Sequence, residues 1–411
     1  MKKLNAGSLQ LVTYITVIIA LLLGCFILLV HTQRQFKTRS YTLTETIQNI
    51  DKGILDLVNN PTKQDSVSIY TNNNALIYIL EPWGVFQKLG VISKQKTYTY
   101  KKTALLGSSQ PIEENALFIK DHNKALVLVG DTKIKGDAYL PKQGVKSGNI
   151  AGQSYNKPRF VDGNIAPIKQ FPKLQFKLRN YLQNIQSYYD KNNFESIIIK
   201  PGSTYLNSFE TTTQVYINPN PIYLENITLK GNIVIQSDSK IVIDVSSNLK
   251  DVILIAPIIE IEDNTKGIFQ AFASEYITVG KHCNLEYPSA LVLIKDYRSP
   301  FTKDNFIDVG SNTRLKGSIL LLGRKDSKNY NPQLIINKSV EIKGEIYSEQ
   351  TIELMGKVFG TTYTDGFVTR ANGSYYQNHL RNAEINRDKL EDEYVGLAFQ
   401  NSKKGIAKWL Y

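Results

Sequence analysis

The sequence predicts a mainly β protein in which an irregular parallel β-helix, or solenoid, follows one apolar N-terminal segment. The first observation is a recurring phrase: an apolar residue, any residue, Gly, any residue, then an apolar or small residue. Because Gly has no Cβ, it permits a tight corner or the close approach of neighbouring coils. The phrase therefore indicates short strands that stack on one another. Its copies occupy residues 134–138, 229–233, 315–319, 342–346 and 354–358, and four of the five carry Lys at the second place.

The region from residue 219 onward supplies the second observation. Runs of three to six residues with alternating apolar positions are separated by Asn, Asp, Gly, Ser or Lys. This pattern is typical of a parallel β-helix. The four downstream copies of the phrase start 86, 27 and 12 residues apart, which predicts loops inserted into the solenoid. A β-sandwich or jelly roll is the alternative fold.

The N-terminal segment at residues 11–30 has 20 residues and no charge. That length is enough to cross a bilayer as a helix. A cleaved secretory signal has a shorter apolar stretch and ends at a small-residue cleavage site, which this segment lacks. The sequence therefore predicts a retained transmembrane anchor. The alternative is lipidation at Cys25, because residues 22–25, Leu-Leu-Gly-Cys, resemble a bacterial lipobox.

The residues just before this segment carry a further resemblance. Lys2, Lys3 and the pair Gly7-Ser8 precede the apolar run. This arrangement resembles the short leader of type IV pilus minor pilins and type II secretion pseudopilins. The resemblance implies that a peptidase cuts after Gly7 and that the mature chain begins at Ser8. The glutamate that the family usually carries at the fifth mature position is replaced here by Val12.

Composition divides the whole chain into successive segments. They are a basic head (1–10), the anchor (11–30), a helical stalk (31–61), a β-rich region leading into the solenoid (62–165), an insertion with an amphipathic helix (166–215), the main solenoid (216–362) and a C-terminal cap or tail (363–411). The stalk is predicted from apolar positions at helical spacing, namely Ile47, Ile50, Ile54, Leu55 and Val58.

The insertion and the tail are both expected to contain helix. An apolar stripe predicts one helix over 171–189 that caps an open end of the solenoid. The stripe consists of Leu174, Leu178, Tyr181, Leu182, Ile185 and Tyr189. The tail mixes both charge signs at 381–393, which favours helix and loop, and its basic aromatic end is expected to fray.

The main solenoid resembles the bactofilin domain and other bacterial right-handed β-helices. The phrases at 342–346 and 354–358 carry this likeness, which spans about 140 residues. The resemblance implies that the β-helix is right-handed. Polymerisation, which is known of bactofilins, is not carried over to this chain.

Charge and motifs limit the function classes. The net charge is +12, but lysines are spread along the chain, which is typical of a dispersed solvated surface. No nucleic-acid partner is expected, because no zinc finger or helix-turn-helix pattern occurs. An anionic glycan or lipid is the remaining candidate ligand. No cofactor or metal site is expected, since phosphate-binding glycine motifs are absent and the four histidines lack ligand spacing.

A polysaccharide lyase or hydrolase is the enzymatic alternative. Such a lyase needs clustered acids that hold calcium and a basic residue that takes a proton. The candidates are Asp296, Asp304 and Asp308, with Arg298 and Arg314. We expect no enzyme, because this density of Asp is ordinary for solenoid loops.

The sequence thus predicts a membrane-anchored, extracytoplasmic structural or scaffold protein, one component of a type IV pilus-like or type II secretion-like envelope machine. Its expected place is the bacterial inner membrane, with one spanning segment and the large C-terminal part in the periplasm. The expected partners are the lipid bilayer and other envelope or filament subunits. An outer-membrane lipoprotein, a surface filament and a surface adhesin are the alternatives.

Overall fold

A computed structural model describes residues 6–59, 66–71, 74–95, 98–109, 115–191, 194–400 and 402–411. The chain divides into two compact units. The first comprises residues 1–57, 66–78 and 91–102, and the second comprises residues 58–65, 79–90 and 103–411. The prediction of a mainly β protein with a long apolar N-terminal helix is confirmed.

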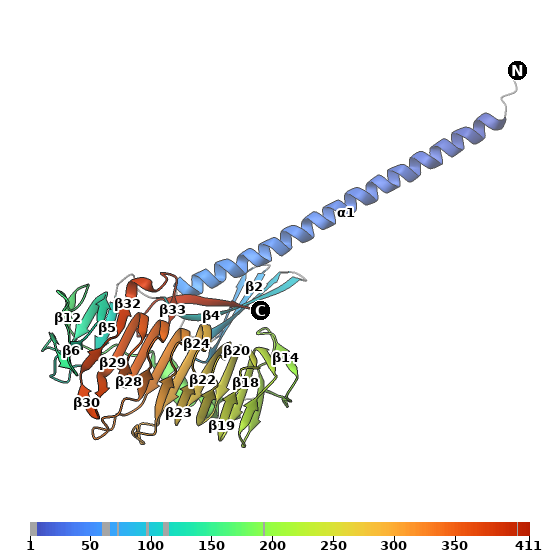
Figure 1. Ribbon diagram of the computed structural model, residues 1–411. Helices are drawn as coiled ribbons and strands as arrows, with labels where there is room; N and C mark the ends of the chain where they lie inside the picture. Colours follow the sequence, from blue (N-terminus) through green and yellow to red (C-terminus); the bar gives the residue numbers. More distant parts are fainter. Residues whose placement is uncertain are drawn as a thin grey trace. The chain divides into compact units, whose positions relative to one another are not determined.

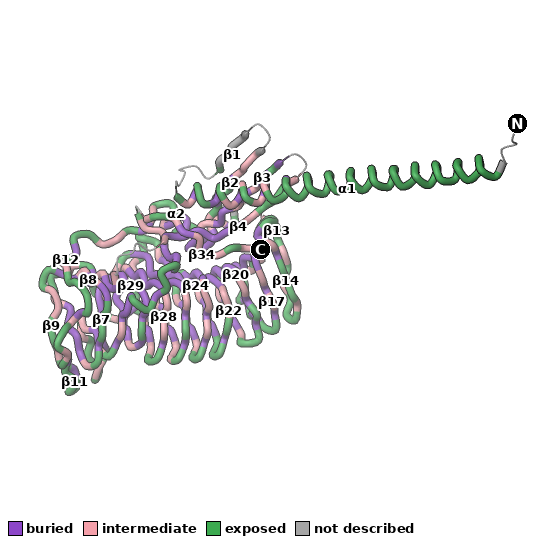
Figure 2. The backbone as a smooth tube through the Cα atoms, turned by 90° about the horizontal axis from the view of Figure 1, so that it is seen from above, coloured by how far each residue is buried: buried purple, intermediate pink, exposed green. Residues whose placement is uncertain are grey.

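The first unit contains helix α1 (Ala6–Asn59), a single helix of 54 residues that continues into the second unit for its last two positions. Residues 7–41 of α1 are exposed, as the green colouring of the helix in Figure 2 shows. Beyond them, a stripe of buried positions begins. It consists of Thr42, Thr46, Ile50, Gly53, Ile54 and Leu57. The predicted stalk face is therefore only partly right, since Leu55 is exposed and two threonines are buried instead.

Four strands of one sheet follow α1 in the order β1–β2–β3–β4. They are β1 (Ser66–Thr71), β2 (Asn74–Trp83), β3 (Phe86–Gln95) and β4 (Tyr98–Ser109). A two-residue turn joins β2 to β3, so this pair is an antiparallel hairpin. Each of β2, β3 and β4 belongs in part to both units.

The chain returns to β4 only at its C-terminal end. Strands β33 (Val395–Gly396) and β34 (Lys404–Leu410) both pair with β4 antiparallel, and all the paired residues lie in the second unit. Residues 110–394 thus separate, in the sequence, strands that are neighbours in the sheet. The expectation of helix and loop at 381–393 was partly right, since residues 387–389 form a 3₁₀ turn and loop residues follow it, but a short strand at 384–386 precedes them. The expectation of a frayed end was wrong, because partner groups on β4 satisfy the backbone of residues 404–410.

Within the described residues, the second unit contains three long parallel ladders, some of whose strands are labelled in Figure 1, and a shorter parallel sheet of β31 (His379–Arg381), β6 (Leu126–Val129) and β9 (Val145–Ser147). The first ladder joins β14 (Thr204–Asn207), β17 (Thr228–Gly231), then the first residues of β20 (Asn248–Ile255), β22 (Lys266–Ala273), β24 (Asn284–Ile294), β26 (Arg314–Leu322), β28 (Glu341–Leu354) and β29 (Lys357–Ala371), and finally β32 (Glu384–Asn386) and β7 (Lys133–Lys135).

The second ladder uses later residues of the same long strands. It joins β13 (Glu195–Ser196), β15 (Gln214–Asn218) and β18 (Ile233–Ser237) to the later residues of β20, β22, β24, β26, β28 and β29, and then to β5 (Asn115–Ile119), β8 (Asp137–Leu140) and β12 (Ile165–Pro167). The third joins β16 (Ile222–Leu224), β19 (Lys240–Ile243), β21 (Ile258–Ile261), β23 (Tyr276–Val279), β25 (Phe306–Val309), β27 (Leu334–Ile336) and the end of β28.

The three ladders share one apolar core. Leu249 and Leu315 from the first ladder, Ile235 from the second and Ile307 from the third are buried in the same cluster. Apolar and outward positions alternate along short strands such as β21 and β23. Burial of this side-chain column stabilises the unit by roughly 25 cal/mol per Å² of apolar surface removed from water.

The glycines of the recurring phrase take their places in the first ladder. Gly317 pairs in register with Gly344, and Gly344 with Gly360. Their φ angles are 141°, 140° and 148°, which side chains with a Cβ rarely adopt. The upstream copy also joins this ladder, since Ile134 pairs with Ile385. The copy at 354–358 enters this ladder only with Lys357 and Val358 and in a different register, because its Gly356 lies between β28 and β29 and the glycine that matches Gly344 is Gly360.

Smaller elements complete the second unit. They are β6 (Leu126–Val129), β9 (Val145–Ser147), β10 (Asn149–Ile150), β11 (Gln153–Ser154), β30 (Ser374–Gln377), β31 (His379–Arg381), the 3₁₀ turn η1 (Arg387–Lys389), and helices α2 (Phe176–Gln183) and α3 (Ile185–Lys191). The helix predicted over 171–189 therefore starts later and is broken at Asn184. The Asn184 side-chain amide donates to the Asn180 carbonyl oxygen, a local bond that competes with the helix. All six apolar residues predicted for this helix are buried.

Candidate functional site

The exposed part of α1 is the first candidate site. Its most apolar stretch has a mean hydropathy of 2.7, and none of that stretch is buried. The helix is therefore a candidate single-pass membrane anchor. Gly7, Ser8 and Cys25 all lie on this exposed part. Cleavage after Gly7 and lipidation of Cys25 stay predictions.

Polar contacts fix the second half of α1 to the strands of the first unit. The Thr46 hydroxyl donates to Gln95 Oε1 at 2.9 Å, and Gln95 Nε2 donates to Glu45 Oε2 at 2.8 Å. Asp51 and Lys102 form an ion pair of 2.5 Å. These bonds tie two successive turns of α1 to β3 and β4. The buried half of the helix is therefore held as part of a folded body.

Gly53 lies where α1 and β2 come closest. A Cβ at this position would overlap the Tyr78 hydroxyl oxygen and would lie 2.6 Å from Leu76 Cδ2. Gly is unfavourable in a helix interior by about 1 kcal/mol relative to Ala. The close approach of the strand explains why a glycine is nevertheless used there.

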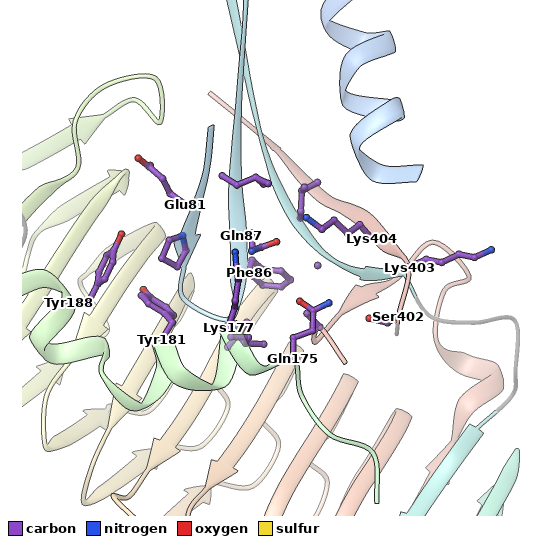
Figure 3. Close-up of a pocket in the computed structure, with 17 residues that line it drawn as sticks. Glu81, Phe86, Gln87, Gln175, Lys177, Tyr181, Tyr188, Ser402, Lys403 and Lys404 are labelled. Carbon is purple, nitrogen blue, oxygen red and sulfur yellow. The ribbon is translucent and has the colours of Figure 1, made fainter. Parts of the chain in front are cut away.

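A cavity of about 280 Å³ lies within the second unit, between β2–β4 residues, α2 and the C-terminal segment (Figure 3). Its apolar lining includes Leu80, Val85, Phe86, Leu106 and Leu178. Its polar lining includes Glu81, Lys177, Lys403 and Lys404, and the last two lie on the side opposite Tyr181 and Tyr188 in Figure 3. Burial strongly raises the pKa of the Tyr181 hydroxyl, so this group stays neutral at physiological pH.

A larger cleft of about 700 Å³ lies elsewhere in the second unit, and we call it the basic cleft. It is lined by residues from segments far apart in the sequence. Its cations are Lys120, Lys173, Arg179, Arg324 and Lys325, its carboxylates are Glu349 and Asp365, and its aromatic residues are Phe171, Phe176, Tyr297 and Tyr347. Five cations face two carboxylates, so the cleft carries an excess of positive charge.

Arg179 and Glu349 form a bidentate ion pair in the basic cleft. Arg179 Nη1 donates to Glu349 Oε1 at 2.7 Å, and Nη2 donates to Oε2 at 2.8 Å. Nη2 also contacts the Tyr297 hydroxyl, and the guanidinium carbon lies 5.3 Å from the Tyr297 ring centre. Burial alone would lower the pKa of Arg179, but the hydrogen bonds and charge of Glu349 raise it. This group is a fixed, permanently charged part of the cleft.

Asp365 anchors the other side of the basic cleft. Its carboxylate is 3% exposed and lies 2.6 Å from Lys325 Nζ, 2.9 Å from His122 Nε2 and 3.6 Å from Lys120 Nζ. Burial would raise the pKa of Asp365, but the hydrogen bond with His122 and the charge of Lys325 lower it to about 2. Asp365 is therefore ionised, and it holds the basic groups around it in place.

Two cations of the cleft are uncommitted. In the part of the chain that the structure describes, the side chains of Lys173 and Arg324 are exposed and have no hydrogen-bond or ion-pair partner. Sequence reasoning missed this cleft. The basic pair Arg324-Lys325 directly after a glycine was the only local signal, and nothing in the sequence brings it to α2.

The lyase candidates are not assembled into a calcium site. Among the described residues, no three His, Cys, Asp or Glu side chains form a group that could hold a metal ion. Asp308 lies on β25, where it accepts a 2.6 Å hydrogen bond from Asn337, and burial raises its pKa. Asp296 and Asp304 lie in the loop between β24 and β25.

The two arginines proposed with these acids make separate contacts. Arg314 begins β26 and lies 3.8 Å from Glu341. Arg298 bonds locally, its backbone N–H donating to Asp296 at 3.0 Å.

The comparisons with known proteins yield one likeness. No protein-family model matches the chain, and no curated protein matches it. Among solved structures, the crystal structure of the competence-associated pilin ComZ from Thermus thermophilus is similar at 8% identity, covering 90% of this chain and 96% of that one. Its TM-score is 0.20, and a likeness at this level carries no argument about fold or function.

Proposed function

We propose that this protein is a membrane-anchored, extracytoplasmic structural subunit of a pilus-like envelope assembly, and that its role is non-enzymatic. The observation that carries the proposal is the division of α1. Residues 7–41 are exposed and their part at 11–30 is largely apolar, while the turns after residue 41 are packed and hydrogen-bonded against strands. An exposed apolar surface of this length needs lipid or the apolar helices of other subunits around it.

The absence of charged side chains from the first part of α1 supports both membrane insertion and packing against other subunits. Residues 4–33 contain no Lys, Arg, Asp or Glu. The helix continues unbroken from this stretch into the packed half. Such a helix can leave the bilayer and pack beside the helices of neighbouring subunits without any change in the folded strands. This property distinguishes an assembly subunit from a plain anchor that ends at the membrane surface.

The proposal extends to the architecture of the second unit as a right-handed parallel β-helix. Support comes from the parallel ladders, the shared core and the glycines that stack in register. A fold of this kind presents long, rigid faces that suit a scaffold role. The proposed location is the bacterial inner membrane, with the second unit outside the cytoplasm.

Mass spectrometry of the N-terminus of the protein purified from its source cells tests the proposal. A mature chain that begins at Ser8 is the expected result. The variant Gly7→Leu should block this cleavage, whereas Gly24→Leu, which alters an equally open position of α1, should leave it intact. A chain that keeps its first residue would favour a plain anchor, and a chain that begins with lipidated Cys25 would favour a lipoprotein.

Crosslinking in membranes tests the contact between subunits. A new cysteine at Gln35 or Phe36 of a Cys25→Ala chain lies on the exposed part of α1 beyond the uncharged stretch, so a short bis-maleimide should join neighbouring helices there if they pack together. The Cys25→Ala chain without the new cysteine is the control, since Cys283 is buried. If both cysteine variants give only monomers under conditions where the assembly is intact, packing through this part of α1 is refuted.

A further inference from the structure

The basic cleft has features of a ligand site that the proposed structural role does not use. Its volume of about 700 Å³ lies within the range of roughly 300–1,000 Å³ that is usual for small-ligand sites. Lys173 lies just before α2, and Arg324 follows β26. Neither side chain has a partner within the described residues. Two cations without a partner at one cleft create a positive potential that attracts an anion.

The aromatic residues of the cleft narrow the ligand further. Phe176 is 77% exposed and Tyr297 is 46% exposed, although both line the same concave surface. The bonds from Arg179 and Glu349 hold the Tyr297 ring in one orientation. Flat, exposed rings in a polar cleft favour a ligand with its own flat apolar faces. The C–H face of a pyranose ring is such a surface, and sugars stack on aromatic side chains through it.

The remaining polar groups of the cleft favour a ligand with many hydroxyls over a ligand with many charges. Glu349 and Asp365 supply acceptor oxygens, and Gln400 supplies both a donor and an acceptor. A hydroxyl can donate to a carboxylate and accept from a cation, so it satisfies both kinds of group. A polyanion with a charge on every unit would instead meet two carboxylates at close range, which is unfavourable. The mixture therefore suits a ligand with few charges and many hydroxyls.

We infer that the basic cleft binds an acidic oligosaccharide, with a sugar carboxylate between Lys173 and Arg324 and a sugar ring against Phe176 and Tyr297. The pre-formed ion pair of Arg179 with Glu349 and the network around Asp365 keep the cleft rigid, so its side chains lose little conformational entropy when the ligand binds. This assignment does not depend on the proposed assembly role, because it uses only residues of the second unit.

Titration calorimetry with the full chain in detergent tests the assignment. The probes are tetramers of hyaluronan, of unsulfated chondroitin and of heparosan, in which every second sugar carries a carboxylate, with the neutral N-acetylglucosamine tetramer as the matched uncharged ligand. At least one acidic tetramer should bind, and the neutral tetramer should bind at least about tenfold more weakly, because it lacks the charge-assisted bonds. Failure of all three acidic tetramers to bind overturns the inference.

Paired variants separate a specific site from general charge attraction. Lys173→Gln with Arg324→Gln should weaken binding at least about tenfold. Lys328→Gln with Lys338→Gln removes the same charge from exposed residues outside the cleft and should leave affinity nearly unchanged. Equal losses in both pairs would refute a site at the cleft. Thermal midpoints of all variants should match wild type, because the altered side chains are exposed.

Two further readouts test the sugar chemistry itself. Phe176→Ala keeps the charge of the cleft and removes an exposed ring, so it should weaken binding several-fold without changing the thermal midpoint. An unchanged affinity would refute the stacking. Single-stranded DNA and inorganic polyphosphate serve as competitors. If either binds more tightly than every acidic tetramer and loses that affinity in the Lys173 and Arg324 double variant, the cleft is a phosphate-polyanion site and the inference is wrong.

Discussion

Stacked positions of the first ladder require glycine, and the variant Gly344→Ala tests this requirement. Gly344 has φ = 140° and pairs with Gly317 on one side and Gly360 on the other. A Cβ at this position would overlap the Gly317 carbonyl oxygen and would lie 2.7 Å from the Tyr394 hydroxyl oxygen. The backbone cannot move away easily, because it is bonded to strands on both sides.

The cost has two parts. A residue with a Cβ at this φ costs about 1–3 kcal/mol of backbone strain. Forcing a methyl group into a closely packed site costs about 1–3 kcal/mol more. Their sum, about 2–6 kcal/mol, should lower the thermal midpoint of the second unit by about 3–9 °C, since an unfolding entropy of about 2.1 cal/mol/K per residue makes 1 kcal/mol correspond to roughly 1.5 °C in a unit of this length.

Gly373→Ala is the matched control. Gly373 has φ = 73°, but nothing lies within 4 Å of the Cβ that alanine would add. It therefore carries backbone strain of about 1–2 kcal/mol without the packing cost. Far-UV circular dichroism melting of the full chain in detergent measures both variants. If Gly344→Ala lowers the midpoint no more than Gly373→Ala does, the close stacking of the ladder is not what selects glycine.

Three further outcomes are expected from the structure. Gly53→Ala should destabilise the first unit, although the same change usually stabilises an open helix, because the new methyl group meets Tyr78; a rise in its melting temperature would contradict this. The folded-state pKa of Asp365 is lowered to about 2, so the ionised carboxylate stabilises the second unit by about 2 kcal/mol above pH 4, and this stabilisation is lost as pH falls through about 2. In the Asp365→Asn variant the free energy of unfolding should therefore depend less on pH in that window; curves of unfolding free energy against pH that run parallel for variant and wild type would contradict this. In a Cys25→Ala chain, Cys283 should react with a maleimide only after denaturation, because it is buried and burial raises its thiol pKa; rapid labelling of the native protein would show otherwise.

The anchor and the mainly β character could be predicted because both depend on local sequence. An uncharged run of 20 residues needs no partner to be recognised. Alternation in short runs likewise reports which side of a strand is buried. The positions of β21 and β23 follow from such alternation alone.

Register could not be predicted, because it depends on which strands meet. The phrase at 354–358 has the same apolar–Gly–apolar pattern as the phrase at 342–346, yet Ile342 pairs with Val358 and not with Leu354. Conversely, Leu285 occupies the same ladder as Leu315 without the glycine two residues later. A bulge between Leu285 and Ser289 restores the register there.

The basic cleft and the C-terminal strands escaped prediction for a related reason. Arg179 meets Glu349 across 170 residues of sequence, and Asp365 meets His122 across 243. Strand β34 has a mixed composition, and its partner β4 lies about 300 residues upstream. No local pattern reports contacts of this length, since they are set by the folded ladders between them.

The return of the chain to β4 determines the order in which the protein can be completed. Ser109 of β4 pairs with Val395, so the two ends of a segment of 285 intervening residues, 110–394, meet side by side. During synthesis, β4 emerges before residues 110–394, whereas β33 and β34 emerge after them. One edge of β4 therefore stays open until residues 395–410 have been made, when Lys408 reaches Asp251 in a 2.5 Å ion pair. Until then this edge can pair with another copy of the chain, so the pairing of β33 and β34 with β4 is the step that protects the fold from misassembly.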